Sequence, residues 1–192
     1  MLILASKSPR RKEILEGLGL EFRCESPEVD ESHPPKVEPS LLVRELALRK
    51  AEAVKLQGST DLVISADTIV YHRGRILGKP KNEEDALVML RLLSGDTHTV
   101  YTGFAVRSMY KTVCDFCATE VRFRALDDDE IIKYIKTGEP MDKAGAYGIQ
   151  GIGSLLVQSI EGDYQNVVGL PASPLMRCLA ENFGFDYYKN RK

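Results

Sequence analysis

The chain opens with the stretch Leu2-Ile3-Leu4-Ala5-Ser6-Lys7-Ser8-Pro9-Arg10-Arg11. Its four apolar residues predict a short buried strand, and a polar turn then leads directly into a helix. Ser8 is a favourable N-cap, and Pro9 suits the first helical turn because its missing N–H costs nothing there. A strand that enters a helix through such a turn is typical of α/β proteins, which bind ligands at this point.

Three basic side chains surround the start of this helix, namely Lys7, Arg10 and Arg11. Cations near a helix N-terminus oppose the helix dipole, at a cost of about 0.3–1 kcal/mol each, unless an anion lies beside them. The free N–H groups of the first turn attract the same anion. We therefore expect a phosphate-binding turn here. The alternative is an ordinary surface helix with a basic first turn.

The composition restricts the class of protein. The chain has 192 residues, of which 43% are hydrophobic and 28% charged, and a net charge of -2. These values are ordinary for a soluble globular protein, and the length suits one large domain or two small lobes that share a cleft. We see no linker that requires independent domains and expect a single domain over residues 1–192. The slight negative charge argues against a broad basic surface for a nucleic-acid polymer and favours a small anionic ligand.

The cysteines and the apolar segments suggest a compartment. The four cysteines show no dense disulfide spacing (Cys24, Cys114, Cys117 and Cys178), which suits a reducing cytoplasm. Cys114 and Cys117 form a CxxC, but in a strand they would point to opposite faces, so we expect no zinc site. The first strand runs into a charged turn rather than a signal peptide, and no apolar run could span a bilayer. We expect a cytoplasmic protein without a membrane partner.

The remaining pattern predicts a mixed α/β fold. Helices are expected over 9–18, from Ser40 to Gly58, from Asn82 to Gly95, from Asp127 to Gly138 and from Ser173 onward; strands are expected over 22–24, 62–66, 69–71, 75–77, 97–108, 112–123 and 154–160. Strands and helices alternate early in the chain, and the middle is antiparallel. This order predicts a mixed, twisted sheet flanked by helices.

Asp67 directly follows the apolar run Leu62-Val63-Ile64-Ser65-Ala66, which is typical of a strand buried on both faces. If the strand ends there, the carboxylate lies at the edge of the sheet, where it can hold a metal ion or orient water. The alternative is that Asp67 caps a turn through its own backbone.

Other polar residues suit a nucleotide. Lys79 lies between Gly78 and Pro80, in a stiff turn that would hold a phosphate-binding ammonium, although this segment taken alone favours a solvated loop lysine. Lys50, on a helix, has no distinguishing context of its own. Residues 142–151 (Asp-Lys-Ala-Gly-Ala-Tyr-Gly-Ile-Gln-Gly) combine small residues with Gln150, whose amide could read a base edge. Neither a Walker sequence nor a dinucleotide-binding glycine motif is present.

Taken together, these segments resemble the Maf family of nucleoside triphosphate pyrophosphatases along nearly the whole chain. The resemblance rests on residues 4–11, Ser65-Ala66-Asp67-Thr68, Gly78-Lys79-Pro80, residues 89–95, residues 139–151 and Val168-Gly169-Leu170-Pro171. It implies two lobes around a nucleotide-binding cleft, as in the inosine triphosphatases, and a homodimer. It also implies hydrolysis between the α and β phosphates of a nucleoside triphosphate, with Mg²⁺ or Mn²⁺ as the divalent cation.

The resemblance assigns roles to individual residues. The family's catalytic aspartate corresponds to Asp67, and its phosphate-handling basic residues to Arg11, Lys50 and Lys79. Its acidic residue before the second helix corresponds best to Glu31, with Glu28 and Asp30 close by, and would share the metal ion with Asp67. Ser8 belongs to the same anion-binding turn as Arg11.

Three further residues match the subgroup that acts on dTTP and UTP, namely Arg10, Thr68 and Gln150. The subgroup that acts on 7-methyl-GTP typically has an aromatic residue in place of that arginine. Two rival functions stay open: a nucleotide-binding regulator of cell division with incidental hydrolysis, and a purine-specific pyrophosphatase of the inosine triphosphate type. A nucleic-acid-binding module is disfavoured by the net charge.

Overall fold

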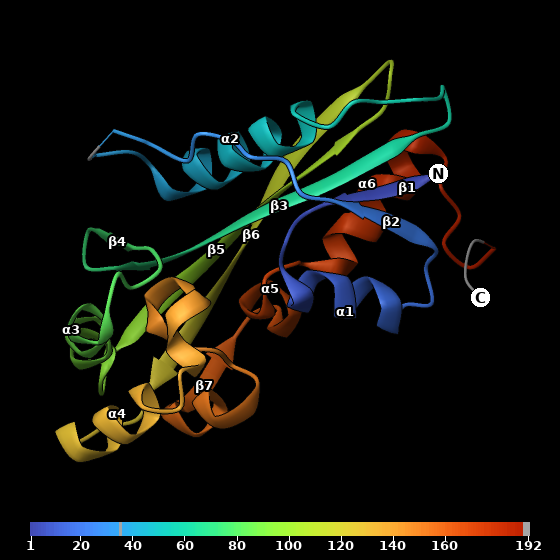
Figure 1. Ribbon diagram of the computed structural model, residues 1–192. Coiled ribbons are helices and arrows are strands. Elements are labelled where there is room, and N and C mark those ends of the chain that lie inside the picture. The colour runs from blue at the N-terminus through green and yellow to red at the C-terminus, as the bar shows by residue number, and fades with distance from the viewer. Residues whose placement is uncertain (35, 190–192) are drawn as a thin grey trace. The chain divides into compact units, whose positions relative to one another are not determined.

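A computed structural model describes residues 1–34 and 36–189. The chain forms two compact units: the first comprises residues 1–67, 102–117 and 169–192, and the second residues 68–101 and 118–168. One seven-stranded mixed sheet has the order β2-β1-β3-β5-β6-β7, with β4 paired to β3 (Figure 1). The expected fold class, a mixed sheet flanked by helices, is therefore confirmed.

The elements follow the predicted order. The strands are β1 (Leu2–Ala5), β2 (Phe22–Glu25), β3 (Leu62–His72), β4 (Arg75–Leu77), β5 (Thr97–Arg107), β6 (Thr112–Phe123) and β7 (Val157–Glu161). The α-helices are α1 (Pro9–Gly17), α2 (Pro39–Glu52), α3 (Glu83–Leu93), α4 (Asp128–Ile135), α5 (Tyr164–Val168) and α6 (Ala172–Phe183). Three 3₁₀ helices lie between α4 and β7: η1 (Glu139–Asp142), η2 (Ala144–Ala146) and η3 (Gly151–Leu156).

In the first unit, helices cover both faces of a parallel arrangement in which β1 lies between β2 and β3. Alternate residues of β1 enter different cores, as the two-residue period of a strand requires. Leu2 and Leu4 join a cluster with residues of α1 and α6, whereas Ile3 and Ala5 join one with residues of α2. Figure 1 shows α1 and α2 on opposite sides of the sheet. Burial on both faces explains why β1 and the first half of β3 are almost continuously apolar.

Helix α2 lies unusually close to β5. A Cβ atom added at Gly103 of β5 would come within 2.3 Å of the carbonyl carbon of Val43 in α2. On β3, the Ser65 hydroxyl donates a hydrogen bond of 2.5 Å to the carbonyl oxygen of Ala47, one turn further along the helix. These two contacts fix the position of α2 on the sheet.

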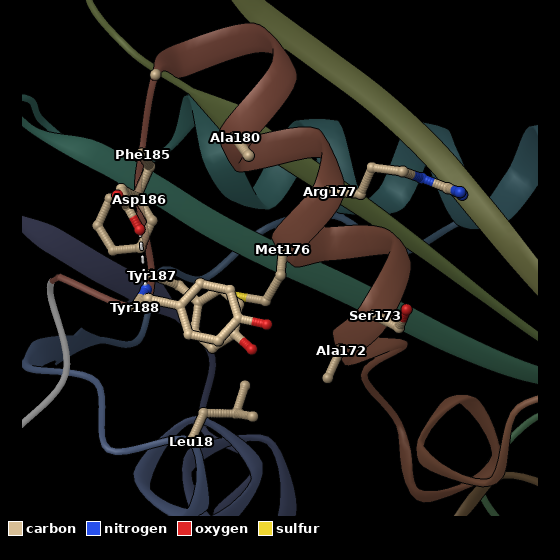
Figure 2. Close-up of a pocket in the computed structure, with 11 residues that line it drawn as sticks. Leu18, Ala172, Ser173, Met176, Arg177, Ala180, Phe185, Asp186, Tyr187 and Tyr188 are labelled. Carbon is tan, nitrogen blue, oxygen red and sulfur yellow. Dashed lines mark hydrogen bonds between the residues drawn. The ribbon is translucent and has the colours of Figure 1, made fainter.

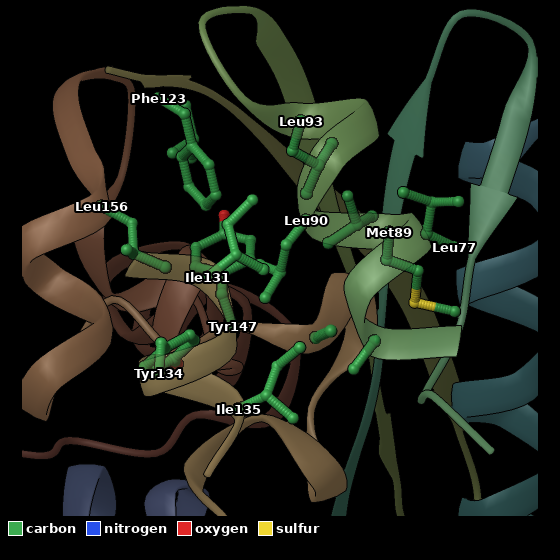
Figure 3. Packing of buried hydrophobic residues seen from close by; sticks show 14 of the residues in the cluster. Leu77, Met89, Leu90, Leu93, Phe123, Ile131, Tyr134, Ile135, Tyr147 and Leu156 are labelled. Carbon is green, nitrogen blue, oxygen red and sulfur yellow. The ribbon is translucent and has the colours of Figure 1, made fainter. Parts of the chain in front are cut away.

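The second unit has its own core, in which α3 and α4 pack with β-strand residues and with the segment that follows α4. Figure 3 shows Leu90 and Leu93 of α3 and Ile131 of α4 close to Phe123 and Tyr147. Both helices are therefore amphipathic, with one apolar face directed into this core. Asn82 and Asp127 cap the two helices, as expected, by accepting backbone N–H bonds from Asp85 and Glu130.

Several predicted boundaries are wrong. Helix α2 ends at Glu52 rather than at Gly58. The Arg107 guanidinium donates hydrogen bonds to the carbonyl oxygens of Ala51 (3.0 Å) and Val54 (2.9 Å) and so terminates the helix. Gly58 belongs to a separate turn, in which its N–H donates to the carboxylate of Asp61.

Near the C-terminus, the expected strand 154–160 begins only at Val157, because residues 151–156 form η3. The segment 164–168, which the sequence did not identify as helical, forms α5. Helix α6 begins at Ala172, so Ser173 lies inside its first turn and is not its cap.

Candidate active site

Asp67 lies within β3, not at its end. The expected strands 62–66 and 69–71 are one continuous strand of 11 residues, and Asp67 is only 8% exposed. The expectation of a sheet-edge position is therefore wrong for β3 itself. However, β1 ends at Ala5 opposite Ser65, so Asp67 lies just beyond the carboxyl end of the neighbouring parallel strand. This is the usual position of ligand sites in α/β sheets.

The side chain of Asp67 faces α2. Val63, Ser65 and Asp67 alternate along β3, and all three lie on the α2 side: Val63 in the core shared with that helix, and Ser65 bonded to Ala47. The third contact is an ion pair of 2.5 Å between Asp67 Oδ1 and the ammonium nitrogen of Lys50, in the last turn of α2. Lys50 has no distinguishing neighbours in the sequence, but the fold places its ammonium against the carboxylate of Asp67.

Lys50 also joins Asp67 to Glu31, in the loop between β2 and α2. Its Nζ lies 2.7 Å from Glu31 Oε1, so one ammonium contacts both carboxylates. The side chains of Lys50 and Asp67 are 13% and 12% exposed, whereas that of Glu31 is 57% exposed. The structure therefore brings together three of the predicted residues, with two carboxylates directed at one point.

Arg11 is fixed in the same unit by two contacts. Its Nε donates to the carbonyl oxygen of Gly169 at 2.8 Å, and its Nη1 donates to the hydroxyl of Ser6 at 3.2 Å. Burial lowers the pKa of Arg11, while the negative charges of Asp67 and Glu31 act in the opposite direction. A guanidinium stays protonated throughout the ordinary pH range, so a cation is held close to these carboxylates.

The turn before α1 has the predicted form, with one difference. Ser8 is the N-cap and Pro9 the first helical residue, but within residues 1–34 and 36–189 the Ser8 side chain accepts no capping bond. Its N–H instead donates to the Ser6 hydroxyl at 3.1 Å. Ser6 therefore organises both the turn and Arg11, a role that the sequence analysis missed. Arg10 is half-buried, and its charge contributes to lowering the pKa of Arg11.

The remaining predicted residues belong to the second unit. Thr68 follows Asp67 directly on β3, Lys79 is exposed in the turn between β4 and α3, and Gln150 is exposed at the N-cap of η3. The N–H of Gly145 donates to the carbonyl oxygen of Gly78 at 3.0 Å. This bond joins the turn that carries Lys79 to the glycine-rich segment that carries Gln150.

The carboxylates are suitable for a divalent cation. Mg²⁺ prefers oxygen ligands and is usually held by one or two protein carboxylates, with water and substrate phosphates completing its shell. Asp67 and Glu31, which converge on the Lys50 ammonium, meet this requirement. Over residues 1–34 and 36–189, no cluster of three or more His, Cys, Asp or Glu side chains could hold a metal ion. The two carboxylates therefore fit a cation that arrives together with phosphate groups.

An apolar pocket of about 630 Å³ lies elsewhere in the first unit, between α6, residues 184–188 and Leu18 (Figure 2). Met176, Phe185, Tyr187 and Tyr188 supply much of its lining, and none of the predicted site residues contributes to it. It is therefore separate from the cluster around Asp67. No helix within residues 1–34 and 36–189 has the length and hydropathy needed to cross a membrane.

Comparison with known proteins identifies the relatives of this chain. A family model described as Maf-like protein matches residues 1–182. The chain belongs to the Maf family. A relative in Bacillus cereus (strain G9842), named dTTP/UTP pyrophosphatase, is 52% identical over 180 residues, which cover 94% of each chain. One in Bacillus mycoides (strain KBAB4), with the same name, is 53% identical over the same coverage.

The resemblance to the Maf family predicted from the sequence is thus confirmed. Among solved structures, the Staphylococcus aureus Ham1 protein matches with a TM-score of 0.46 and 13% identity, covering 99% of this chain and 93% of its own.

Proposed function

We propose that this Maf-family protein hydrolyses dTTP and UTP between the α and β phosphates, releasing pyrophosphate and the nucleoside monophosphate. Nucleoside triphosphate pyrophosphatase activity follows from the similarity to enzymes named dTTP/UTP pyrophosphatase, which extends over 94% of the chain. The observation that supports the chemistry is the ion-paired cluster of Asp67, Lys50 and Glu31.

The cationic groups supply charge for the triphosphate. Arg11 and the N–H groups at the start of α1 lie just after the carboxyl end of β1, and the Lys50 ammonium is held in the same unit. A triphosphate carries several negative charges at neutral pH, and hydrolysis displaces one of its anionic groups. Positioning and charge stabilisation are therefore the main tasks of the protein. We assign phosphate binding to Ser8, Arg10, Arg11, Lys50 and Lys79.

We assign to Asp67 the task of orienting the attacking water. Its carboxylate is buried, and its position is fixed by the Lys50 ammonium at 2.5 Å, so it can accept a hydrogen bond from water in a defined direction. Asp67 and Glu31 would also hold Mg²⁺ or Mn²⁺, which supplies positive charge to the phosphate oxygens. We assign base recognition to Thr68 and Gln150, which together with Arg10 match the pyrimidine subgroup.

The first experiment measures pyrophosphate release from dTTP, UTP, CTP, ITP and 7-methyl-GTP, with Mg²⁺, with Mn²⁺ and with a chelator. Release that requires the metal and is fastest with dTTP and UTP would support the proposal. Faster release from ITP or 7-methyl-GTP would preserve the reaction but contradict the roles of Arg10, Thr68 and Gln150. Tight nucleotide binding without turnover of any member would favour a nucleotide-binding regulator of cell division instead.

We also propose that the protein is a homodimer in the cytoplasm, with a nucleotide and not a nucleic-acid polymer or a membrane as its partner. The slight negative net charge of -2 is consistent with this choice of ligand. Light scattering coupled to size-exclusion chromatography tests the dimer, because a mass of 21.4 kDa would contradict it.

A further inference from the structure

Glu139 is an acidic side chain of the glycine-rich region in the second unit, and its carboxylate accepts several hydrogen bonds. It lies at the start of η1 and is half-buried. Its Oε1 accepts a hydrogen bond of 2.9 Å from the Tyr134 hydroxyl and one of 3.0 Å from the N–H of Gly153. Its Oε2 accepts one of 3.1 Å from the N–H of Ile152. One carboxylate therefore holds a tyrosine of α4 and two consecutive N–H groups of η3.

Gly151 makes room for this carboxylate, because a Cβ atom there would lie 2.9 Å from Glu139 Oε2. A Cβ atom at Gly153 would lie 2.5 Å from the Tyr134 hydroxyl and 3.0 Å from Glu139 Oε1, so this glycine makes room for the whole hydrogen-bonded group. Gly151 also has a φ of +63°, which L side chains rarely adopt. The high glycine content of residues 145–153 is thus partly explained by contacts with internal side chains.

The same carboxylate acts on both sides of Gln150. On the C-terminal side it accepts the N–H bonds of η3, of which Gln150 is the N-cap. On the N-terminal side it acts through Tyr134, whose hydroxyl accepts a bond of 3.2 Å from the N–H of Gly148. The backbone is therefore anchored two residues before and two residues after Gln150.

We propose that Glu139 is a positioning residue which fixes the backbone around Gln150 and thereby sets the enzyme's preference for its pyrimidine base. This inference rests on the base-reading role proposed above for Gln150. An amide can distinguish bases only if its carbonyl and NH₂ groups are held in a fixed direction. Gln150 is exposed, so its direction depends on the backbone that carries it. The carboxylate supplies that rigidity because hydrogen bonds to an ionised acceptor are stronger than neutral ones.

A mutational cycle tests the proposal, using Glu139→Gln, Gln150→Ala and the double variant. Rates are measured with dTTP and CTP, whose bases differ in the donor and acceptor groups of their edge. UTP, which has the same sugar as CTP and no 5-methyl group, is measured as well, so that a change in the ratio can be assigned to the base edge. Glu139→Gln retains the side-chain shape but replaces one acceptor oxygen by an NH₂ group that faces a backbone N–H. We expect kcat/KM for dTTP to fall about tenfold, mainly through KM, and the dTTP-to-CTP ratio to fall with it. In the Gln150→Ala background, Glu139→Gln should change kcat/KM by no more than about twofold.

Two further variants separate positioning from folding. Tyr134→Phe removes only the hydroxyl that links Glu139 to Gly148, so it should lower the dTTP-to-CTP ratio less, but in the same direction. Asp129→Asn is the matched control, since Asp129 forms a surface ion pair with Lys133 in the same unit. It should leave the ratio unchanged. Amide hydrogen exchange at Gly148, Ile152 and Gly153 should accelerate in Glu139→Gln and not in Asp129→Asn.

The outcomes are distinguishable. An unchanged dTTP-to-CTP ratio in Glu139→Gln, or effects of Glu139→Gln and Gln150→Ala that simply multiply, would overturn the proposal. An unchanged ratio in Gln150→Ala would overturn it too, because Glu139 would then have no base-reading residue to position. Wild-type protein that releases no pyrophosphate would instead contradict the proposed function, and amide exchange would still decide whether Glu139 holds this backbone.

Discussion

Asp67 combines burial with charge, and this combination makes it the most informative single residue of the first unit. Its carboxylate is held by the Lys50 ammonium on the face of β3 that contacts α2. A buried carboxylate is costly unless it is paired, so a position of this kind is typical of a functional group. Both neighbours in the sequence, Ala66 and Thr68, direct their side chains to the other face of the strand.

Replacing Asp67 by Asn tests its role. The substitution preserves shape but removes the negative charge, so we expect turnover of dTTP to fall about 10²-fold or more. The fold should be retained, as judged by circular dichroism. Asp115→Asn, which changes an exposed residue of β6 in the same unit, serves as the control. Near wild-type turnover in Asp67→Asn would show that the assignment is wrong.

The two hydrogen bonds of the Arg11 side chain lead to a second prediction for a single residue. Its guanidinium uses two different nitrogens to contact Gly169 and Ser6. Lysine retains the charge but cannot form this two-point contact, so Arg11→Lys should lower kcat/KM for dTTP about tenfold. The comparison that matters is with Lys12→Arg, because Lys12 is exposed on the same helix. Equal activity of Arg11→Lys and wild type would mean that charge alone suffices.

The sequence predicts the individual residues well where local chemistry distinguishes them. The turn around Ser8 and the caps Asn82 and Asp127 are recognisable from their neighbours. Lys50 and Glu31 are not: apart from the family resemblance, a lysine in a helix and an acid in an acidic loop have no local signal. Their pairing depends on where β3 places Asp67, and this is a long-range contact. The contact of Glu139 with Gly151 likewise appears only in the fold, because these residues are 12 positions apart in the sequence.

Among the elements, α2 and β5 pack with almost no space between their backbones. Adding a methyl group at Gly103 would place it 2.3 Å from the backbone of Val43, well inside van der Waals contact. Because backbone cannot rotate away as a side chain can, the whole helix must shift. The same helix carries Lys50 at its other end. Packing on the sheet and the geometry of the site are therefore coupled through one element.

We expect Gly103→Ala to lower the free energy of unfolding by about 1–3 kcal/mol, because it overpacks this contact. Activity should also fall, since a shift of α2 moves the Lys50 ammonium relative to Asp67. Urea unfolding and pyrophosphate release measure the two effects. Gly17→Ala is the control, because no atom lies within 4 Å of the added methyl group. Equal stability of Gly103→Ala and wild type would contradict the predicted displacement.

The order and type of most elements were predictable from periodicity, whereas α5, η3 and the ends of several elements were not. The pattern of β3 contains polar Asp67 and Thr68, which in sequence resemble the end of a strand. Pairing with neighbouring strands overrides this local preference. Similarly, α2 ends where Arg107 of β5 donates hydrogen bonds to the carbonyl oxygens of Ala51 and Val54. These contacts join residues more than 50 positions apart in the chain.

At the scale of the molecule, one buried histidine makes stability sensitive to acid. His98 of β5 is 2% exposed, and its Nε2 lies 2.7 Å from the Tyr147 hydroxyl. Within the described part of the chain, its Nδ1 has no hydrogen-bond partner. Burial, with a smaller contribution from His72, lowers the pKa of His98 to about 3. The neutral ring is therefore the form that the folded protein contains.

This pKa shift predicts a pH dependence with a definite sign. In the unfolded chain the pKa of a histidine is about 6.5. Below that pH the unfolded state binds a proton at His98, whereas the folded state does not bind it until the pH approaches 3. Stability should thus be complete above about pH 6.5 and fall as the pH decreases toward 3, by at most about 1.4 kcal/mol per pH unit from this group. Urea unfolding at a series of pH values measures the slope.

His98→Gln isolates the contribution of this ring. The glutamine amide retains a group that can bond to Tyr147 but does not titrate. The free energy of unfolding should therefore depend less steeply on pH between about pH 6.5 and pH 4, the range below the histidine pKa of the unfolded chain. His33→Gln, at an exposed position, should keep the wild-type slope. Parallel pH profiles for wild type and His98→Gln would rule out His98 as the source.

The division of the chain into units has a consequence for its synthesis. The polypeptide passes from one unit to the other four times, at 67/68, 101/102, 117/118 and 168/169. The second unit has all its segments once residue 168 has been translated, whereas the core of the first still lacks Leu175 and Leu179 of α6. We therefore expect the first unit to complete its fold after the second, although most of its residues come earlier in the chain, which differs from the usual N-to-C order of folding during synthesis. Neither unit corresponds to an uninterrupted stretch of a gene, so recombination could not have exchanged one of them alone.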